Sequence, residues 1–267
     1  MQKFKQIAHD SLPPYFWRFY SKFNRKTGFF GNYHTWDEAR RASVGYDADV
    51  ILNKVKNALL KVKNGEAIYE RDSFLFDKVQ YSWPLLAGLL WVASREGNRL
   101  NIIDFGGSLG SSYFQQKYFF LHLNEFQWNI VEQPKFVEIG KLEFEDKHLR
   151  FYYNINECIE EKHPVAILLS SVVQYLERPY DLLSDIIAKD FKYILFDRTP
   201  FLYKGDDRIT IQKVPKEIYK ASYPSWFFNQ AKFLTFFSSK YELIADFESS
   251  DQANLPSVFK GYIFKQK

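Results

Sequence analysis

The stretch LNIIDFGGSLG, residues 100–110, constrains the fold of this 267-residue chain more than any other. Two adjacent β-branched isoleucines favour a buried strand over Leu100–Asp104. The residues after the turn, Ser111–Leu121, can form a helix. Three glycines stand between the strand and the helix, at Gly106, Gly107 and Gly110. A strand, a glycine turn and a helix in this order build a crevice at the carboxyl end of a parallel sheet, where open α/β folds bind ligands.

The spacing of the glycines distinguishes between ligand classes. A dinucleotide-binding turn needs glycine at its first, third and sixth positions, but counted from Gly106 the third and sixth are Ser108 and Ser111. A phosphate-binding loop needs a Gly-Lys pair after four spacers, and the sequence has no such run. Asp104 beside a glycine turn instead suits a phosphate-free cation that the backbone can approach closely. S-adenosylmethionine, with a sulfonium and an ammonium group, is such a ligand.

A second acid supports this interpretation. FQWNIVE over Phe126–Glu132 predicts the next strand, and Glu132 ends it 28 residues after Asp104 (132 − 104). An acid at that place can accept hydrogen bonds from both hydroxyls of a ribose. NAD and S-adenosylmethionine share the ribose, so Glu132 alone does not separate them, whereas the glycine spacing favours S-adenosylmethionine.

The chain resembles the class I S-adenosylmethionine-dependent methyltransferases, and most closely a group associated with bacterial surface-polysaccharide genes. The resemblance covers most of residues 28–200 and is carried by Gly31–Tyr46, Ser82–Leu86, Asp104–Gly110, Val131–Pro134 and Ser170–Leu176. The usual class I turn is Asp-x-Gly-x-Gly-x-Gly, and Ser108 replaces its middle glycine here. The resemblance implies an α/β fold with a Rossmann-like, seven-stranded sheet and helices on both faces.

The alternation of strands and helices after residue 100 independently predicts a parallel sheet with right-handed crossovers. Further strands are expected at Leu149–Tyr153, Val165–Ser170 and Tyr193–Asp197, with a closing antiparallel pair at Tyr241–Glu248 and Ser257–Lys265. Helices are expected at Asp47–Lys63, Pro84–Ser94, Pro134–Leu142, Ile155–Glu160 and Pro179–Ala188. Residues 1–80 lack this rhythm, so we expect a helical cap segment there and the cofactor-binding domain over residues 81–267.

Ten residues are candidates for binding the cofactor, from the turn, the second acid and the resemblance: Asp104, Gly106, Gly107, Ser108, Gly110, Glu132, Gln133, Asn154, Ser170 and Ser171. The resemblance places Asn154 near the adenine, although a helix-capping role is the alternative. It also places Ser170–Tyr175 along the transferred methyl group, the alternative being a strand-end cap with Tyr175 packed. Candidate catalytic residues are Gln174, Tyr175, Asp197 and His34.

Two of these candidates have competing interpretations. Asp197 is the acid that ends the fifth predicted strand and could act as a base, but Arg198 beside it suggests an ion pair. His34 could reach the cleft if residues 28–47 fold over it, and is otherwise a solvated loop residue. Thr35 and Glu38 match a capping box that opens a helix after His34.

Composition excludes several function classes. The single cysteine rules out an internal disulfide framework and a cysteine zinc site, and none of the five histidines has metal-ligand spacing. The net charge of +4 comes without a Lys/Arg block, so no nucleic-acid partner is expected. Met1–Asp10 is polar rather than signal-like, and the longest apolar run, Leu85–Ala93, is too short to span a bilayer. We therefore expect a cytoplasmic protein.

Aromatic residues make up 19% of the chain, which fits either a phenylalanine-rich core or an aromatic acceptor cleft. The mix of aromatic and basic residues over Tyr15–Phe30 allows peripheral membrane contact, with packing against the main domain as the alternative. By resemblance, the chain is expected to methylate a small-molecule or glycan acceptor in surface-polysaccharide synthesis. The alternative is a non-catalytic methyltransferase-like protein that binds a nucleoside or a partner. The oligomeric state stays open.

Overall fold

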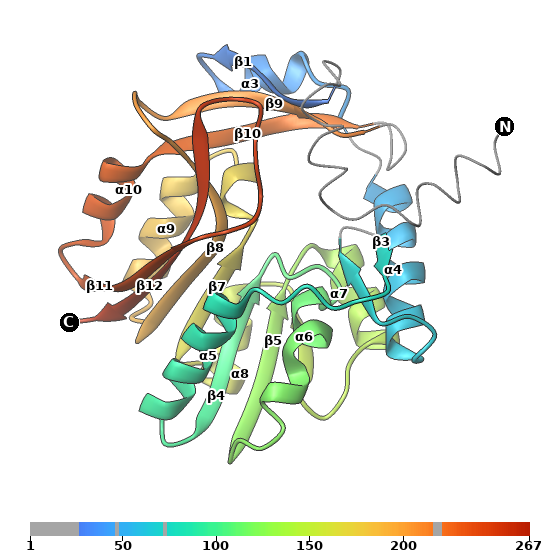
Figure 1. Ribbon diagram of the computed structural model, residues 1–267. Helices are drawn as coiled ribbons and strands as arrows, with labels where there is room; N and C mark the ends of the chain where they lie inside the picture. The colour runs from blue at the N-terminus through green and yellow to red at the C-terminus, as the bar shows by residue number, and fades with distance from the viewer. Residues whose placement is uncertain (1–26, 46–47, 72–73, 216–220) are drawn as a thin grey trace, which may run out of the picture.

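The computed structural model describes residues 27–45, 48–71, 74–215 and 221–267. Seven strands form its central sheet: β4 (Arg99–Phe105), β5 (Glu125–Val131), β6 (Leu149–Tyr152), β7 (Ala166–Ser170), β8 (Tyr193–Leu202), β11 (Tyr241–Glu248) and β12 (Ser257–Gln266). Their order is β6-β5-β4-β7-β8-β12-β11, and the part from β5 to β8 can be followed in Figure 1. The first five are parallel, and β12 runs antiparallel between β8 and β11. The predicted α/β fold, with its closing antiparallel pair, is confirmed.

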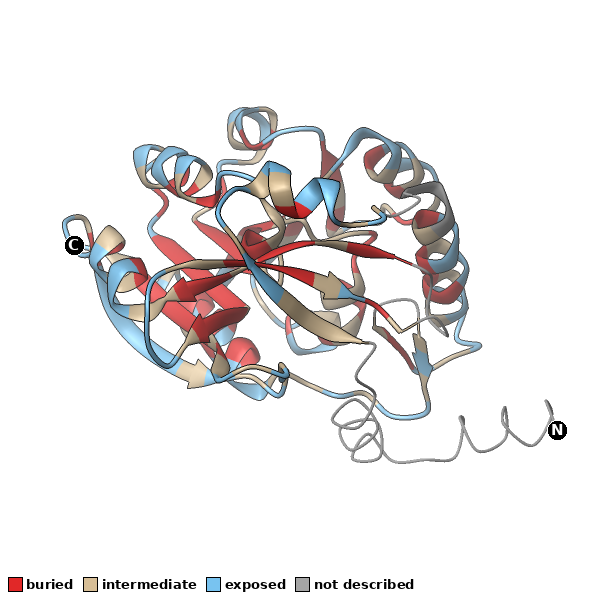
Figure 2. Cartoon of the chain, turned by 90° about the horizontal axis from the view of Figure 1, so that it is seen from above, coloured by how far each residue is buried: buried red, intermediate tan, exposed pale blue. Residues whose placement is uncertain are grey.

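Helices cover both faces of this sheet. They are α4 (Ala48–Lys63), α5 (Trp83–Arg95), α6 (Ser111–Gln116), α7 (Pro134–Glu143), α8 (Ile155–Lys162), α9 (Pro179–Ala188) and α10 (Gln230–Phe237). Side chains alternate along a strand, so Ile102 packs in the cluster under α4–α7, whereas Ile103 packs in the cluster under α8–α10. This two-sided burial, visible as the red strands of Figure 2, is the reason that the strands read as continuous apolar runs.

All but one of the helices predicted in the described residues begin and end within a few residues of the predicted bounds. The helix expected at Ser111–Leu121 stops at Gln116 and continues as a 3₁₀ turn, η1 (Lys117–Phe119). A second 3₁₀ turn, η2 (Val173–Tyr175), follows β7. The fifth predicted strand is longer than expected, because β8 runs five residues beyond Asp197 to Leu202.

Three strands that were not predicted form a second, antiparallel layer: β1 (Gly28–Tyr33), β9 (Arg208–Lys213) and β10 (Ser222–Asn229). We call them the cap sheet. It joins the central sheet where Phe228 and Asn229 of β10 pair with the far end of β8. A short helix, α3 (Trp36–Arg41), packs on it and stacks Trp36 on Trp226 at 6.2 Å. In Figure 1 the cap sheet lies across the carboxyl ends of the parallel strands.

The segment before residue 80 contains strands as well as helices. A hairpin of β2 (Tyr69–Arg71) and β3 (Phe74–Phe76) follows α4. Thr35 caps α3 by accepting from the Glu38 N–H, as the capping pattern predicts, and the Glu38 carboxylate accepts from the N–H of His34, one residue before the cap. The domain division at residue 80 stays a prediction. Of the proposed membrane-contact segment, residues 15–26 lie outside the described residues.

Candidate functional site

A cavity of about 630 Å³ opens over the carboxyl ends of β4 and β7 and the middle of β8. Its walls come from segments far apart in the chain. They are the glycine turn after β4, the approach to α5, the end of β7, the middle of β8, the β2 strand, the cap sheet, and the loop between β11 and β12. The cavity therefore lies where the strand–turn–helix pattern predicted a ligand crevice. In the described part of the chain, no helix is long and apolar enough to cross a membrane, and no group of side chains could hold a metal ion.

Asp104 lies at the floor of this cavity with a side chain that is almost wholly buried. The Trp128 indole N–H donates to its Oδ2 at 3.0 Å. The pKa of Asp104 is raised to about 7, chiefly because the group is buried; the Trp128 hydrogen bond acts to lower this pKa, and the nearby charge of Glu132 acts to raise it. A negative charge at Asp104 is therefore costly until a cation lies beside it.

The turn that follows brings the backbone against this carboxyl group. A Cβ on Gly107 would lie 2.6 Å from Asp104 Oδ2, so only glycine fits. Gly106, Ser108 and Gly110 all have left-handed backbones, with φ of +71°, +56° and +103°. Ser108 thus takes a conformation that favours glycine, at the place where the usual class I turn has glycine.

Glu132 follows β5 directly and lies beside the same turn. Its carboxylate accepts the N–H of Gln133 at 2.6 Å and the N–H of Ser108. Burial raises its pKa against these two hydrogen bonds. The described cavity lining does not include Glu132, Gln133 or Asn154. Gln133 precedes α7 and is exposed, and Asn154 caps α8 by accepting from the Glu157 N–H at 2.9 Å, which is the capping alternative.

At the opposite end of the cavity, the last residue of β7 meets β8. Ser170 Oγ donates to Asp197 Oδ2 at 3.2 Å, and both residues line the cavity. Asp197 is 2% exposed, and its Oδ1 has no hydrogen-bond partner among the described residues. Burial raises the pKa of Asp197, the charges of Arg198 and Arg71 lower it, and that of Asp251 raises it.

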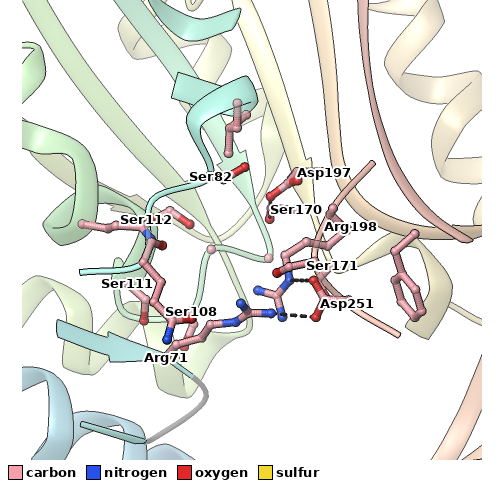
Figure 3. Close-up of a pocket in the computed structure, with 18 of the residues that line it drawn as sticks. Arg71, Ser82, Ser108, Ser111, Ser112, Ser170, Ser171, Asp197, Arg198 and Asp251 are labelled. Atoms are coloured by element: carbon pink, nitrogen blue, oxygen red, sulfur yellow. Dashed lines mark hydrogen bonds and ion pairs between the residues drawn. The ribbon is translucent and has the colours of Figure 1, made fainter. Parts of the chain in front are cut away.

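Arg198 forms its ion pair with Asp251 rather than with Asp197. Arg198 Nε lies 3.2 Å from Asp251 Oδ2, and Arg71 Nη2 lies 2.6 Å from Oδ1 (Figure 3). Burial acts to raise the pKa of Asp251, but the two guanidinium groups outweigh it and hold that pKa below its usual range. The three side chains connect β2, β8 and the β11–β12 loop across the cavity wall.

The remaining candidate residues differ in whether they line the cavity, lie behind its lining or lie outside it. Tyr175 lines the cavity and donates from its hydroxyl to Gln212 Oε1 of the cap sheet at 2.8 Å. Gln174 is buried behind the lining, where it donates to Ser171 Oγ at 3.1 Å and to the Arg198 carbonyl at 3.3 Å. Ser171 lines the cavity, whereas His34 is exposed and lies outside the lining.

Several lining residues were missed by the sequence analysis. They are polar or aromatic side chains of the cap sheet, of β2 and of the β11–β12 loop, chiefly Glu70, Arg71, Gln212, Tyr223 and Asp251. Only β9 carried a usable signal, because Ile209 and Ile211 alternate with polar residues as in a half-buried strand. Arg71 and Asp251 are 180 positions apart and belong to no local motif.

No protein-family model matches the chain, and no curated protein matches it. Among solved structures, the N-terminal domain of EvdMO1 with SAH and D-fucose aligns at TM-score 0.49 and 11% identity, covering 84% of this chain and 98% of that one. The 1,6-didemethyltoxoflavin-N1-methyltransferase of Burkholderia thailandensis aligns at 0.45 and 11%, covering 84% and 95%. Magnesium protoporphyrin IX methyltransferase of Synechocystis PCC 6803 aligns at 0.46 and 11%, covering 69% and 80%.

Proposed function

We propose that this protein is an S-adenosylmethionine-dependent methyltransferase. The observation that carries the proposal is Asp104, a buried carboxyl group at the cavity floor with a pKa raised to about 7. A cationic ligand group beside it would offset the cost of its charge. Gly107 leaves room for this carboxyl group beside the turn, because a Cβ there would lie 2.6 Å from Asp104 Oδ2.

The residues around the turn fit the parts of this cofactor. Asp104 would hold the ammonium group, and Glu132 would accept hydrogen bonds from the ribose hydroxyls. By resemblance, Asn154 would contact the adenine, and Ser170 and Ser171 would lie beside the transferred methyl group. When bound, S-adenosylmethionine supplies a methyl carbon whose bond to sulfur breaks with the electron pair staying on sulfur. The chain's own task is then to align an acceptor with that carbon.

The acceptor we propose is a hydroxyl of a sugar or glycan-related molecule in surface-polysaccharide synthesis, on the resemblance over residues 28–200. Tyr175 and Asp197 line the cavity beyond the turn, and we propose that they act on the acceptor. Gln174 holds Ser171 and the Arg198 backbone in place through its two hydrogen bonds. We assign no catalytic role to His34, which lies outside the lining.

A thermal-shift experiment tests the cofactor. SAH at about 100 times its Kd should stabilise the fold by about 2.7 kcal/mol, which raises the Tm of a chain of this size by roughly 5–10 °C. NAD at the same concentration should leave the Tm unchanged, because the glycine spacing does not suit a dinucleotide. Stabilisation by NAD and not by SAH would contradict the proposed function.

A further inference from the structure

Glu70 of β2 is a carboxylate in an unusual place for a charged group. Its side chain is 1% exposed, and it belongs to the cavity wall. Charged side chains are almost never fully buried unless a partner holds them, because water solvates an ion strongly. The Ser111 hydroxyl donates to Glu70 Oε2 at 2.5 Å, a distance typical of a hydroxyl bound to a carboxylate. This hydrogen bond joins β2 to the start of α6.

Ser111 is tied closely to the glycine turn. It is the first residue of α6 and follows Gly110, which has a φ of +103°. The Gly110 N–H donates to the Gly107 carbonyl at 3.0 Å, so the turn is closed by its own backbone just before Ser111. A displacement of Ser111 would therefore shift the turn in which Gly107 lies against Asp104. Glu70 thus acts on the proposed cofactor end through Ser111.

The next residue of the same strand reaches the far wall of the cavity, which β8 and the β11–β12 loop form. Arg71 Nη2 lies 2.6 Å from Asp251 Oδ1, and Asp251 Oδ2 lies 3.2 Å from Arg198 Nε (Figure 3). Arg198 directly follows Asp197, which is proposed to act on the acceptor. The strand β2 itself pairs with β3 in a sheet of its own. Two consecutive side chains, those of Glu70 and Arg71, therefore link the glycine turn to the far wall.

We propose that Glu70 is a positioning residue for methyl transfer, which holds the glycine turn at a set distance from the far wall. This inference rests on the proposed function. Methyl transfer needs the acceptor atom in line with the bond between the methyl carbon and sulfur, and a misplacement of about 1 Å can lower the rate about 100-fold. In this arrangement the turn carries the cofactor and the far wall faces the acceptor, so β2 sets their separation.

Calorimetric titration with SAH tests this role without knowledge of the acceptor. Glu70→Met keeps the length of the side chain but cannot accept the hydrogen bond, and Ser111→Ala removes the donor. Each should weaken SAH binding at least about fivefold, a fraction of what the loss of a hydrogen bond to a charged group costs. The double variant should lose no more than either single variant, because both break the same bond. Glu70→Gln keeps an acceptor oxygen and should bind SAH within about twofold of the wild type.

Hydrogen exchange at saturating SAH separates positioning from a general structural role. In the wild type, SAH should slow exchange in residues 249–252 of the β11–β12 loop at least about tenfold, because β2 joins this loop to the turn. In Ser111→Ala with the same SAH occupancy, exchange there should slow by less than about twofold. A hydrogen bond that only stabilised the fold would leave the effect of SAH on this loop unchanged.

Glu96→Met is the matched control. Glu96 accepts from the Tyr193 hydroxyl at 3.1 Å and pairs with Lys192, outside the described cavity lining, so this variant should bind SAH normally. Wild-type SAH affinity in both Glu70→Met and Ser111→Ala would overturn the role of Glu70 and leave the cofactor proposal standing. Additive losses in the double variant, or equal loop protection by SAH in the wild type and Ser111→Ala, would overturn it as well. Failure of the wild type to bind SAH overturns the proposed function itself.

Discussion

Two buried carboxyl groups, Asp104 and Asp197, mark the two ends of the cavity, and burial raises the pKa of both. A carboxyl group whose folded pKa exceeds its unfolded value lowers the stability of the protein once the pH is high enough to ionise it. Each residue therefore costs stability in the free protein. We expect a ligand that carries positive charge or a donor hydrogen to recover that cost.

Asp104→Asn tests this cost. The pKa of Asp104 rises from 3.8 to about 7 on folding. The folded state thus holds an extra proton between these values, and the free energy of unfolding falls as pH rises from about 4 to about 7. The asparagine side chain does not ionise, so the free energy of unfolding of the variant does not fall for this reason. In urea titrations without ligand, we expect its stability relative to the wild type to increase by about 4 kcal/mol between pH 4 and pH 8.

Asp146→Asn is the control of opposite sign. Burial acts to raise the pKa of Asp146, but hydrogen bonds from Tyr113, His148 and Leu149 outweigh it and lower that pKa. Its charge stabilises the fold above pH 4, so the variant should lose stability relative to the wild type as pH rises. If both variants showed the same pH trend, burial at Asp104 would not explain the effect.

Gly107→Ala tests the close contact between the glycine turn and the Asp104 carboxyl group. The added Cβ would lie 2.6 Å from the Asp104 carboxyl group, and the φ of Gly107 is not left-handed, so crowding is the only defect. We expect SAH affinity to fall at least about tenfold, since a turn shifted by crowding no longer fits its ligand. Gly65→Ala, which has open space but a φ of +77°, is the control and should bind SAH normally. Unchanged affinity in Gly107→Ala would place the cofactor elsewhere.

At the scale of elements, one carboxylate links the β2–β3 hairpin to the central sheet. Asp251 in the β11–β12 loop binds Arg71 of β2 and Arg198 of β8. Their side chains are 22–24% exposed, so solvent screens these ion pairs only in part. The position of β2 over the cavity depends on this cluster in addition to its contacts with α4 and α6.

Asp251→Asn should therefore loosen the cavity wall without disrupting the core. We expect a loss of about 2 kcal/mol in stability, because two guanidinium groups lose their shared partner. Faster hydrogen exchange should be confined to β2, β3 and the β11–β12 loop. Asp246→Asn, which removes a more exposed carboxylate paired with Lys260 on the neighbouring strand, is the control and should cost less, about 0.5–1 kcal/mol. Equal effects of the two variants would rule out a structural role for the cluster.

The elements that sequence predicted are those with local signals. Apolar runs such as that of β4, and prolines such as Pro134 and Pro179 at helix starts, lie within single segments. In the cap sheet only β9 has such a signal, in the alternation of Ile209 and Ile211 with polar residues, and β1 pairs with residues far along the chain. The same holds for the site: the glycine turn and both acid-ended strands are local, whereas Arg71 and Asp251 meet only through the fold.

At the scale of the whole molecule, the central sheet and the cap sheet divide the cavity between them. The parallel strands contribute Asp104, Ser170 and Asp197, and the cap sheet contributes Gln212 and Tyr223. The cap strands β9 and β10 are inserted between β8 and β11, while β1 comes from the start of the described chain. We therefore expect changes in the cap sheet to alter the proposed acceptor side while leaving the proposed cofactor end intact.

The pairing of β1 with β9 also sets an order of events during synthesis. Gly28 pairs with Lys213, so β1 leaves the ribosome 185 residues (213 − 28) before its partner exists. At about 5–20 residues per second, this interval is about 10–40 s. The strands β4–β8 are complete before β9 is made, so they can pair while the aromatic side chains of β1 still lack their neighbours. The cap-sheet wall of the cavity thus forms after the strands that carry Asp104 and Asp197, and the β11–β12 loop, which completes the lining, is made later still.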